Sequence, residues 1–98
     1  MERSARNTNV GEKLETRIAG RPIIDMFATG NCMRETRERL GYSVADVQAM
    51  LGFANPQSVY KWERGANLPS IDNLVVLAWI YGVKMDDLVV CSSAFEVG

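Results

Sequence analysis

The sequence contains no histidine and only two cysteines, and these absences exclude several kinds of site. Without histidine, no Ser–His or Cys–His pair can activate a nucleophile. Cys32 and Cys91 form no CxxC motif, so we predict neither a disulfide framework nor a cysteine-rich metal site. A glycine-rich phosphate loop is also missing. We therefore expect no enzymatic activity, no bound metal and no cofactor.

The sequence also has neither a large excess of one charge nor a long apolar run. Eleven Lys and Arg residues face twelve Asp and Glu residues, so the net charge is −1. The chain as a whole therefore lacks the basic footprint that is typical of nucleic-acid-binding proteins. No apolar run approaches the roughly 18 residues of a membrane span, and no secretory signal is present. We expect a cytoplasmic protein with reduced thiols and no contact with a membrane.

The charges that are present are unevenly distributed. Residues 1–28 carry five basic and four acidic side chains, and residues 29–65 carry the same numbers. Residues 66–98 carry one basic side chain and four acidic ones. An asymmetry of this kind is compatible with a protein of which one end faces phosphates.

Apolar spacing and helix-end signals predict a compact all-α bundle of five short helices. Serine or asparagine N-caps mark three of the helix starts, and Pro56 occupies a first helical position, where its missing N–H costs nothing. The fourth helix is apolar nearly all round and should be central. The expected helices are 30–40, 44–51 after Ser43, 56–64 after Asn55, 71–82 after Ser70, and 85–90.

The helical region is flanked by two segments of different composition. We expect an N-terminal arm over residues 1–28, a helical domain over 29–90 and a C-terminal tail over 91–98. The first twenty residues are mostly polar, so few side chains offset the entropy of ordering, and we expect the arm to be partly mobile. Ile23–Phe27 differs because four of its five residues are large and apolar. This segment should pack against the bundle or against a partner.

The order and spacing of five segments resemble a known family. The chain resembles the phage-repressor-like helix-turn-helix domains of bacterial regulators, the Cro/C1 or xenobiotic-response-element type. The segments that carry the resemblance are RETRERLGYS, SVADVQAMLG, YKWERG, LPSIDNLVVLAWIYGV and MDDL. The resemblance covers roughly residues 30–90. It implies a lambda-repressor-like five-helix bundle with an N-terminal extension, and sequence-specific binding to double-stranded DNA.

Three features depart from the common family pattern. Gln48 stands in the second helix where the family usually has a small alanine, and Val44 follows the N-cap serine where a polar residue is frequent. The turn GFANP is longer than the common form. These differences bear on the angle between the second and third helices.

In the family, the third helix enters the major groove with its N-terminal half. The match therefore points Gln57, Ser58 and Lys61 toward DNA, with Tyr60 beside them. Glutamine can bond adenine N6 and N7, and lysine can reach guanine O6 and N7. The alternative is that Gln57, Tyr60 and Lys61 form an ordinary solvated face. The full set of expected DNA-contacting residues is Ser43, Asn55, Gln57, Ser58, Tyr60, Lys61, Arg64 and Asn67.

Other prominent residues have structural interpretations. Val59 and Trp62 are three apart and should face the core. The resemblance implies that Arg37 and Glu63 form a buried structural pair, and not a catalytic one. Trp79 is expected in the core or on a dimer surface, in preference to a ligand pocket.

The expected function is that of a small repressor that binds a two-fold operator as a homodimer through the third helix. An alternative of another class is a protein-binding module on the same fold, antitoxin- or inhibitor-like, with little or no DNA binding. Ile23–Phe27 or the C-terminal tail would contact such a partner. We expect the dimer seam near the C-terminus, where the available apolar residues are Leu88, Val89, Val90, Phe95 and Val97.

Overall fold

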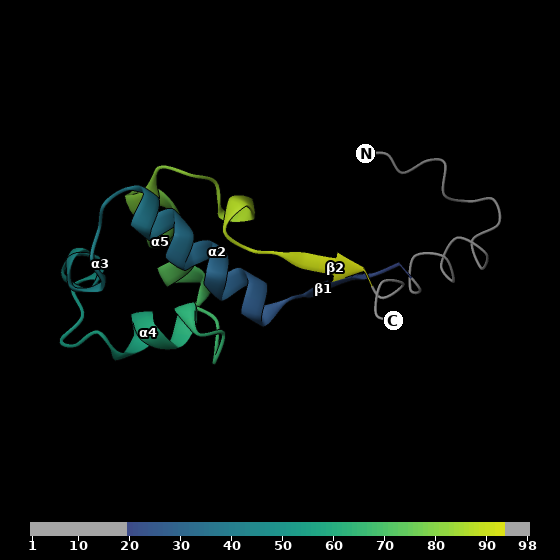
Figure 1. Cartoon of the computed structure of the whole chain (residues 1–98), viewed down its shortest axis with the longest axis horizontal. Helices are drawn as coiled ribbons and strands as arrows, with labels where there is room; N and C mark the ends of the chain where they lie inside the picture. Colours follow the sequence, from purple (N-terminus) through teal and green to yellow (C-terminus); the bar gives the residue numbers. More distant parts are fainter. Residues whose placement is uncertain (1–19, 94–98) are drawn as a thin grey trace. The chain divides into compact units, whose positions relative to one another are not determined.

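The computed structural model describes residues 20–93, and Figure 1 shows the arrangement of the elements. The expectations for residues 1–19 and for Phe95 and Val97 lie outside this range. Residues 24–91 form one compact unit, which holds all the helices described below. The elements are β1 (Pro22–Ile24), α2 (Met26–Arg39), α3 (Val44–Leu51), α4 (Gln57–Glu63), α5 (Ile71–Tyr81), η2 (Met85–Asp87) and β2 (Cys91–Ser93).

The predicted five-helix, all-α architecture is only partly correct. Residues 20–93 contain four α-helices, but the expected fifth helix is a single 3₁₀ turn, η2, and β1 and β2 pair in a two-stranded sheet. Strands of three residues are too short to show the alternation by which a strand is detected in a sequence. The chain leaves helical geometry after Leu88 because the backbone of Val90 is bonded to distant residues instead.

Those distant residues lie at the start of α2. The helix begins at Met26 and not at Gly30, because Asp25 is its N-cap and accepts a hydrogen bond from Ala28 N–H at 2.9 Å. Asp25 N–H donates to the carbonyl of Val90 at 2.8 Å. The fully buried Thr29 hydroxyl accepts from Val90 N–H at 2.9 Å. The prediction missed this connection because it joins residues from opposite ends of the domain.

The predicted N-caps of α3 and α5 are confirmed, and α3 ends before Gly52 as predicted, whereas α5 ends at Tyr81, one residue earlier than predicted. Ser43 Oγ accepts from Asp46 N–H at 3.0 Å, and Ser70 Oγ accepts from Asn73 N–H at 3.4 Å. Gly52 and Gly82 close the two helices with positive φ, a conformation that glycine adopts without a steric penalty.

The start of α4 differs slightly from the prediction. Pro56 is the N-cap residue and not the first helical residue, and it offers no capping side chain. Asn55 nevertheless acts as a cap, because its Oδ1 accepts a hydrogen bond from Gln57 N–H at 3.1 Å. A rigid proline between the asparagine and the helix therefore shifts the boundary by one residue without removing the cap.

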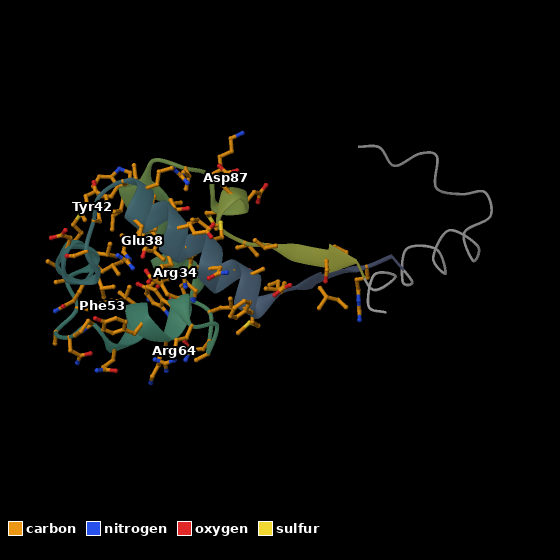
Figure 2. All side chains as sticks on the ribbon, viewed as in Figure 1. Arg34, Glu38, Tyr42, Phe53, Arg64 and Asp87 are labelled. Carbon is orange, nitrogen blue, oxygen red and sulfur yellow. The ribbon has the colours of Figure 1, made fainter. Side chains whose placement is uncertain are left out.

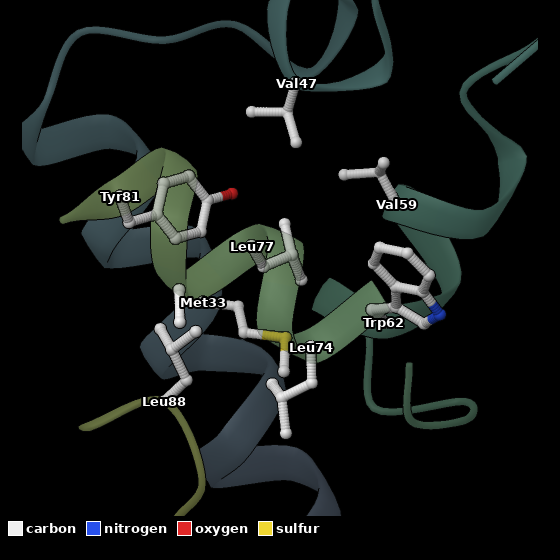
Figure 3. Packing of buried hydrophobic residues seen from close by; sticks show 9 residues of the cluster. Met33, Val47, Val59, Trp62, Leu74, Leu77, Tyr81 and Leu88 are labelled. Atoms are coloured by element: carbon white, nitrogen blue, oxygen red, sulfur yellow. The ribbon is translucent and has the colours of Figure 1, made fainter. Parts of the chain in front are cut away.

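One hydrophobic core holds the helices together, and Figure 3 shows Leu77 of α5 near its middle. Helix α5 supplies the largest share of this core, as expected of a central helix. Its apolar residues are not all covered, however, because Ile71, Val75 and Trp79 are exposed. The apolar spacing of Val44, Val47, Met50 and Leu51 predicts a buried stripe on α3, but Met50 is exposed. The core residues are Met33, Val47, Val59, Trp62, Leu74, Leu77, Ala78, Tyr81 and Leu88.

Helices α2 and α4 approach each other at a glycine. A Cβ atom at Gly30 would lie 2.6 Å from the carbonyl oxygens of Trp62 and Glu63. Real Cβ atoms do not approach backbone oxygens this closely, so the contact requires glycine. Gly30 therefore fixes how near α4 lies to α2.

Candidate nucleic-acid interface

Helix α4 has one buried face and one exposed face. Val59 and Trp62 are buried in the core, as predicted, and are only 1% and 6% exposed. Gln57, Ser58 and Lys61 are all exposed. Because the core holds one side of this short helix, the orientation of its exposed side chains is determined by packing.

The exposed face of α4 carries positive charge without exposed negative charge. Lys61 and Arg64 are its two cations, and Figure 2 shows Arg64 on the side of α4 turned away from α2. The one acidic residue between Asn55 and Asn67 is Glu63, which is buried. The local charge therefore suits a polyanion although the whole chain is slightly acidic.

Glu63 is buried because it pairs with Arg37 of α2. Arg37 Nε donates to Oε2 of Glu63 at 2.7 Å, and Nη2 donates to Oε1 at 2.9 Å. Arg37 Nη1 also donates to the carbonyl of Tyr42 at 2.9 Å. The hydrogen bond to Glu63 raises the pKa of Arg37 above its already high value, against the opposing effect of burial. The arrangement has the two-pronged geometry of a structural ion pair.

Tyr81 of α5 lies within the electrostatic influence of this pair. Burial raises the pKa of Tyr81 to about 12, and the negative charge of Glu63 acts in the same direction. The phenol therefore stays protonated at neutral pH and behaves as part of the core. Nothing in its surroundings indicates a catalytic role.

Ser43 has a more restricted role than the sequence suggested. Its Oγ accepts from Asp46 N–H, and its own N–H donates to Oδ2 of Asp46 at 2.8 Å. The carboxylate of Asp46 therefore already occupies the electropositive start of α3. Only the hydroxyl hydrogen of Ser43 remains available to a phosphate.

The remaining predicted contacts lie on either side of α4. Asn55 precedes the helix and Asn67 follows it, and both are exposed. Gly65 begins the second of these loops with a φ of +77° and lies so close to the carbonyl of Met26 that a Cβ would be 2.9 Å from that oxygen. The structure thus places Asn55, Tyr60, Arg64 and Asn67 on the surface, within α4 or close to its ends in the chain.

Gln48 has a role that the sequence did not assign. The side-chain Nε2 of Gln48 donates to the backbone carbonyl of Phe53 at 3.1 Å, and the backbone carbonyl of Gln48 accepts from Phe53 N–H at 3.1 Å. The sequence signal was the unusual glutamine four residues before the start of an unusually long turn. The residue types alone did not show that the two departures belong together.

Sites of other kinds are not found in the described part of the chain. Within residues 20–93, no three cysteine or acidic residues are grouped so that they could hold a metal ion. None of the helices that the structure describes is long and apolar enough to cross a membrane.

Comparison with known proteins identifies the fold. The sequence model of the helix-turn-helix family HTH_3, of the Cro/C1 type, matches residues 33–88. The chain belongs to this family. The match includes α3, α4, α5 and the second half of α2, and thus the whole exposed face described above. No curated protein sequence matches the chain.

Solved structures with similar folds include a controller protein, a DNA-binding domain and a protein crystallised with a substrate. The restriction-modification controller protein C.AhdI from Aeromonas hydrophila is 26% identical, with a TM-score of 0.60 over 65% of this chain and 96% of that one. The DNA-binding domain of BldD from S. venezulae is also 26% identical, with a TM-score of 0.58 over 66% of this chain and 96% of that one. HppE, crystallised with its substrate and cobalt(II), is 22% identical over 66% of this chain and 36% of that one, with a TM-score of 0.59. That third likeness shows the fold alone.

Proposed function

We propose that this protein is a sequence-specific, DNA-binding transcriptional regulator, a small repressor that reads a two-fold operator through α4. The observation that carries the proposal is the two-sided character of α4. Val59 and Trp62 anchor one side in the core, while Gln57, Ser58 and Lys61 are free on the other. The HTH_3 match and the likeness to the BldD DNA-binding domain support this assignment.

The exposed residues of α4 divide by chemistry into base readers and phosphate contacts. Gln57 can offer its amide oxygen and nitrogen together to adenine, and Lys61 can donate to guanine. Arg64 follows the last residue of the helix, and Tyr60 presents a hydroxyl on an exposed ring. We assign Arg64 and Tyr60, together with the amides of Asn55 and Asn67, to the sugar-phosphate backbone.

Two-fold binding requires a homodimer, and we place its seam on the α5 stripe, defined as Ile71, Val75 and Trp79. These residues recur every fourth position, so they lie along one face of α5, and they are 68%, 48% and 79% exposed. Asp72 is the one charged residue of α5, so two copies of the helix could meet with little like-charge repulsion. We prefer this seam to the expected C-terminal one because Leu88, one of the five residues expected there, is fully buried in the core.

Selection of bound DNA from a random pool tests the proposal. We expect the protein to enrich an inverted repeat. On the selected site Gln57→Ala should weaken binding by about 1–3 kcal/mol, while binding to random DNA stays the same. Arg64→Ala should weaken binding to both DNAs and reduce the salt dependence by about 0.9 per half-site. Failure to enrich any sequence would refute the proposal.

The exposed α5 stripe also supports the alternative, a protein-binding module with little or no affinity for DNA. A solvent-exposed tryptophan on an otherwise apolar helix face is typical of a protein interface. The two functions differ in their response to salt. DNA affinity that depends on α4 falls steeply with salt concentration, whereas binding through an apolar stripe does not.

A further inference from the structure

The segment between α3 and α4 is held by few hydrogen bonds. Gly52 ends α3 in a left-handed conformation, and α4 begins at Gln57. Within the described chain, neither Ala54 nor Asn55 takes part in a backbone–backbone hydrogen bond outside regular elements. The path of this turn therefore depends on whatever fixes its ends, while α4 is held in addition by its buried face and by the Arg37–Glu63 pair.

Gln48 fixes the end next to α3. Its backbone carbonyl accepts from Phe53 N–H, and its side-chain Nε2 donates to the carbonyl of Phe53, both at 3.1 Å. Both backbone groups of Phe53 are thus bonded to one residue of α3. An alanine at position 48 would retain only the first of these bonds, because it has no side-chain donor.

Phe53 in turn contacts α4 through its side chain. Its ring meets the ring of Trp62 edge to face, with centroids 5.8 Å apart and an interplanar angle of 69°. Trp62 is buried in the core and lies in α4, one residue after Lys61. Gln48, Phe53 and Trp62 therefore form a continuous series of contacts from α3, across the turn, to the helix that presents Gln57.

We propose that Gln48 is a positioning residue for DNA recognition, which acts with the packing of α4 against the core to set the orientation of α4 through Phe53, and so affects how well Gln57 and Lys61 fit the bases. This inference rests on the proposed function. Base readout depends on orientation because hydrogen bonds weaken steeply when donor and acceptor are misaligned. Non-specific attraction to phosphates has no such directional requirement.

The stability of the domain should depend little on Gln48. The side chain is only half-buried, and water can replace its amide at the carbonyl of Phe53. A single hydrogen bond of this kind contributes little net stability, so the fold should persist without it. Loss of the bond should instead allow α4 a wider range of orientations.

Gln48→Met tests the inference, because methionine keeps the length of the side chain and removes the donor. The chain contains one other glutamine, so Gln57→Met is a matched control at a proposed base reader. Affinity for the selected site and for random DNA, the thermal midpoint, and a second selection from a random pool should be measured for each variant. A Gln48→Lys variant retains a donor and provides a second test if Gln48→Met does not fold.

We expect Gln48→Met to lose about tenfold or more in affinity for the selected site and little for random DNA, with a thermal midpoint close to that of the parent. Its second selection should relax preference at several positions of each half-site, whereas Gln57→Met should relax preference at one. Gln48→Lys should keep the preference of the parent.

Three results would overturn the inference: unchanged specific affinity in Gln48→Met, an equal loss on both DNAs, or lost preference in a folded Gln48→Lys variant. An absence of selected sequences for the parent would refute the proposed function instead, so the two failures are distinguishable.

Discussion

Arg37 of α2 and Glu63 of α4 are joined by two parallel hydrogen bonds of 2.7 and 2.9 Å between guanidinium and carboxylate. The pair connects the first helix of the domain to the C-terminal end of the proposed recognition helix. Both side chains are almost completely buried, so neither charge has water as an alternative partner. The pair also removes the one negative charge that α4 would otherwise present to DNA.

Breaking this pair should destabilise the domain strongly. Arg37→Ala leaves the carboxylate of Glu63 buried and unpaired, and we expect the free energy of unfolding to fall by about 3–5 kcal/mol. Arg39→Ala, which removes an exposed arginine of the same helix, should change it by no more than about 0.5 kcal/mol. Urea denaturation of both variants provides the measurement. If Arg37→Ala unfolds like the parent and yet loses DNA binding, the pair is functional and the structural interpretation is wrong.

Whether Gly30→Ala stabilises or destabilises the domain tests how closely α2 and α4 approach each other. In an open helix this change stabilises by roughly 0.5–1 kcal/mol because alanine is the better helix former. Here the added methyl group would lie 2.6 Å from two carbonyl oxygens of α4, so we expect destabilisation by about 1–3 kcal/mol. Thermal unfolding, with Glu35→Ala at an exposed position of α2 as the control, measures the effect. A stabilised Gly30→Ala protein would show that α2 and α4 are farther apart than described.

The features that the sequence predicted are mainly local. Ser43 with Asp46, and Ser70 with Asn73, are capping pairs three residues apart, so each can be recognised from the sequence. The two bonds between Thr29 and Val90 join residues 61 positions apart, and no local pattern indicates them. The small sheet was missed for the same reason, whereas the early start of α2 was missed although its cap is local, since Asp25 accepts from Ala28 N–H three residues on.

The site was predictable from two sources of unequal strength. The burial of Val59 and Trp62 followed from helical spacing, and the structure confirms it. The assignment of Gln57 and Lys61 to DNA came from the family resemblance and stays a prediction. The role of Gln48 was not predictable, because its partner Phe53 becomes identifiable only when the path of the turn is known.

Tyr81 predicts a dependence of stability on alkaline pH. Its pKa is about 12 in the folded protein and 10.0 in an unconstrained tyrosine. Because the folded value is the higher one, the unfolded chain releases the phenolic proton first as the pH rises. The contribution of Tyr81 to the free energy of unfolding is therefore fully present below pH 10 and is lost as the pH rises toward 12. Tyr81→Phe should show a smaller loss of stability over this interval in urea denaturation, and an identical loss would contradict the assignment.

Trp79 offers the most direct test of self-association. Side chains on the α5 stripe are separated by one helical turn, so two copies of α5 related by a two-fold axis can place their stripes against each other. Three side chains cover less than the ~800 Å² per partner of a standard interface, so the free protein should dimerise weakly. Binding to both half-sites of an operator raises the effective concentration of one copy near the other and should complete the dimer.

Trp79→Glu should abolish this association, because it removes the largest side chain of the stripe and places two like charges near each other across the axis. Leu40→Glu is the matched control, since it introduces the same charge at a leucine that is 45% exposed outside the stripe. Sedimentation of the free proteins and of their complexes with a selected operator measures the effect. We expect the parent and Leu40→Glu to bind as two copies per operator, and Trp79→Glu to bind with reduced cooperativity. A Trp79→Glu protein that dimerises as well as the parent would place the seam elsewhere, and a strict one-to-one complex of the parent on a two-fold site would rule out the dimer itself.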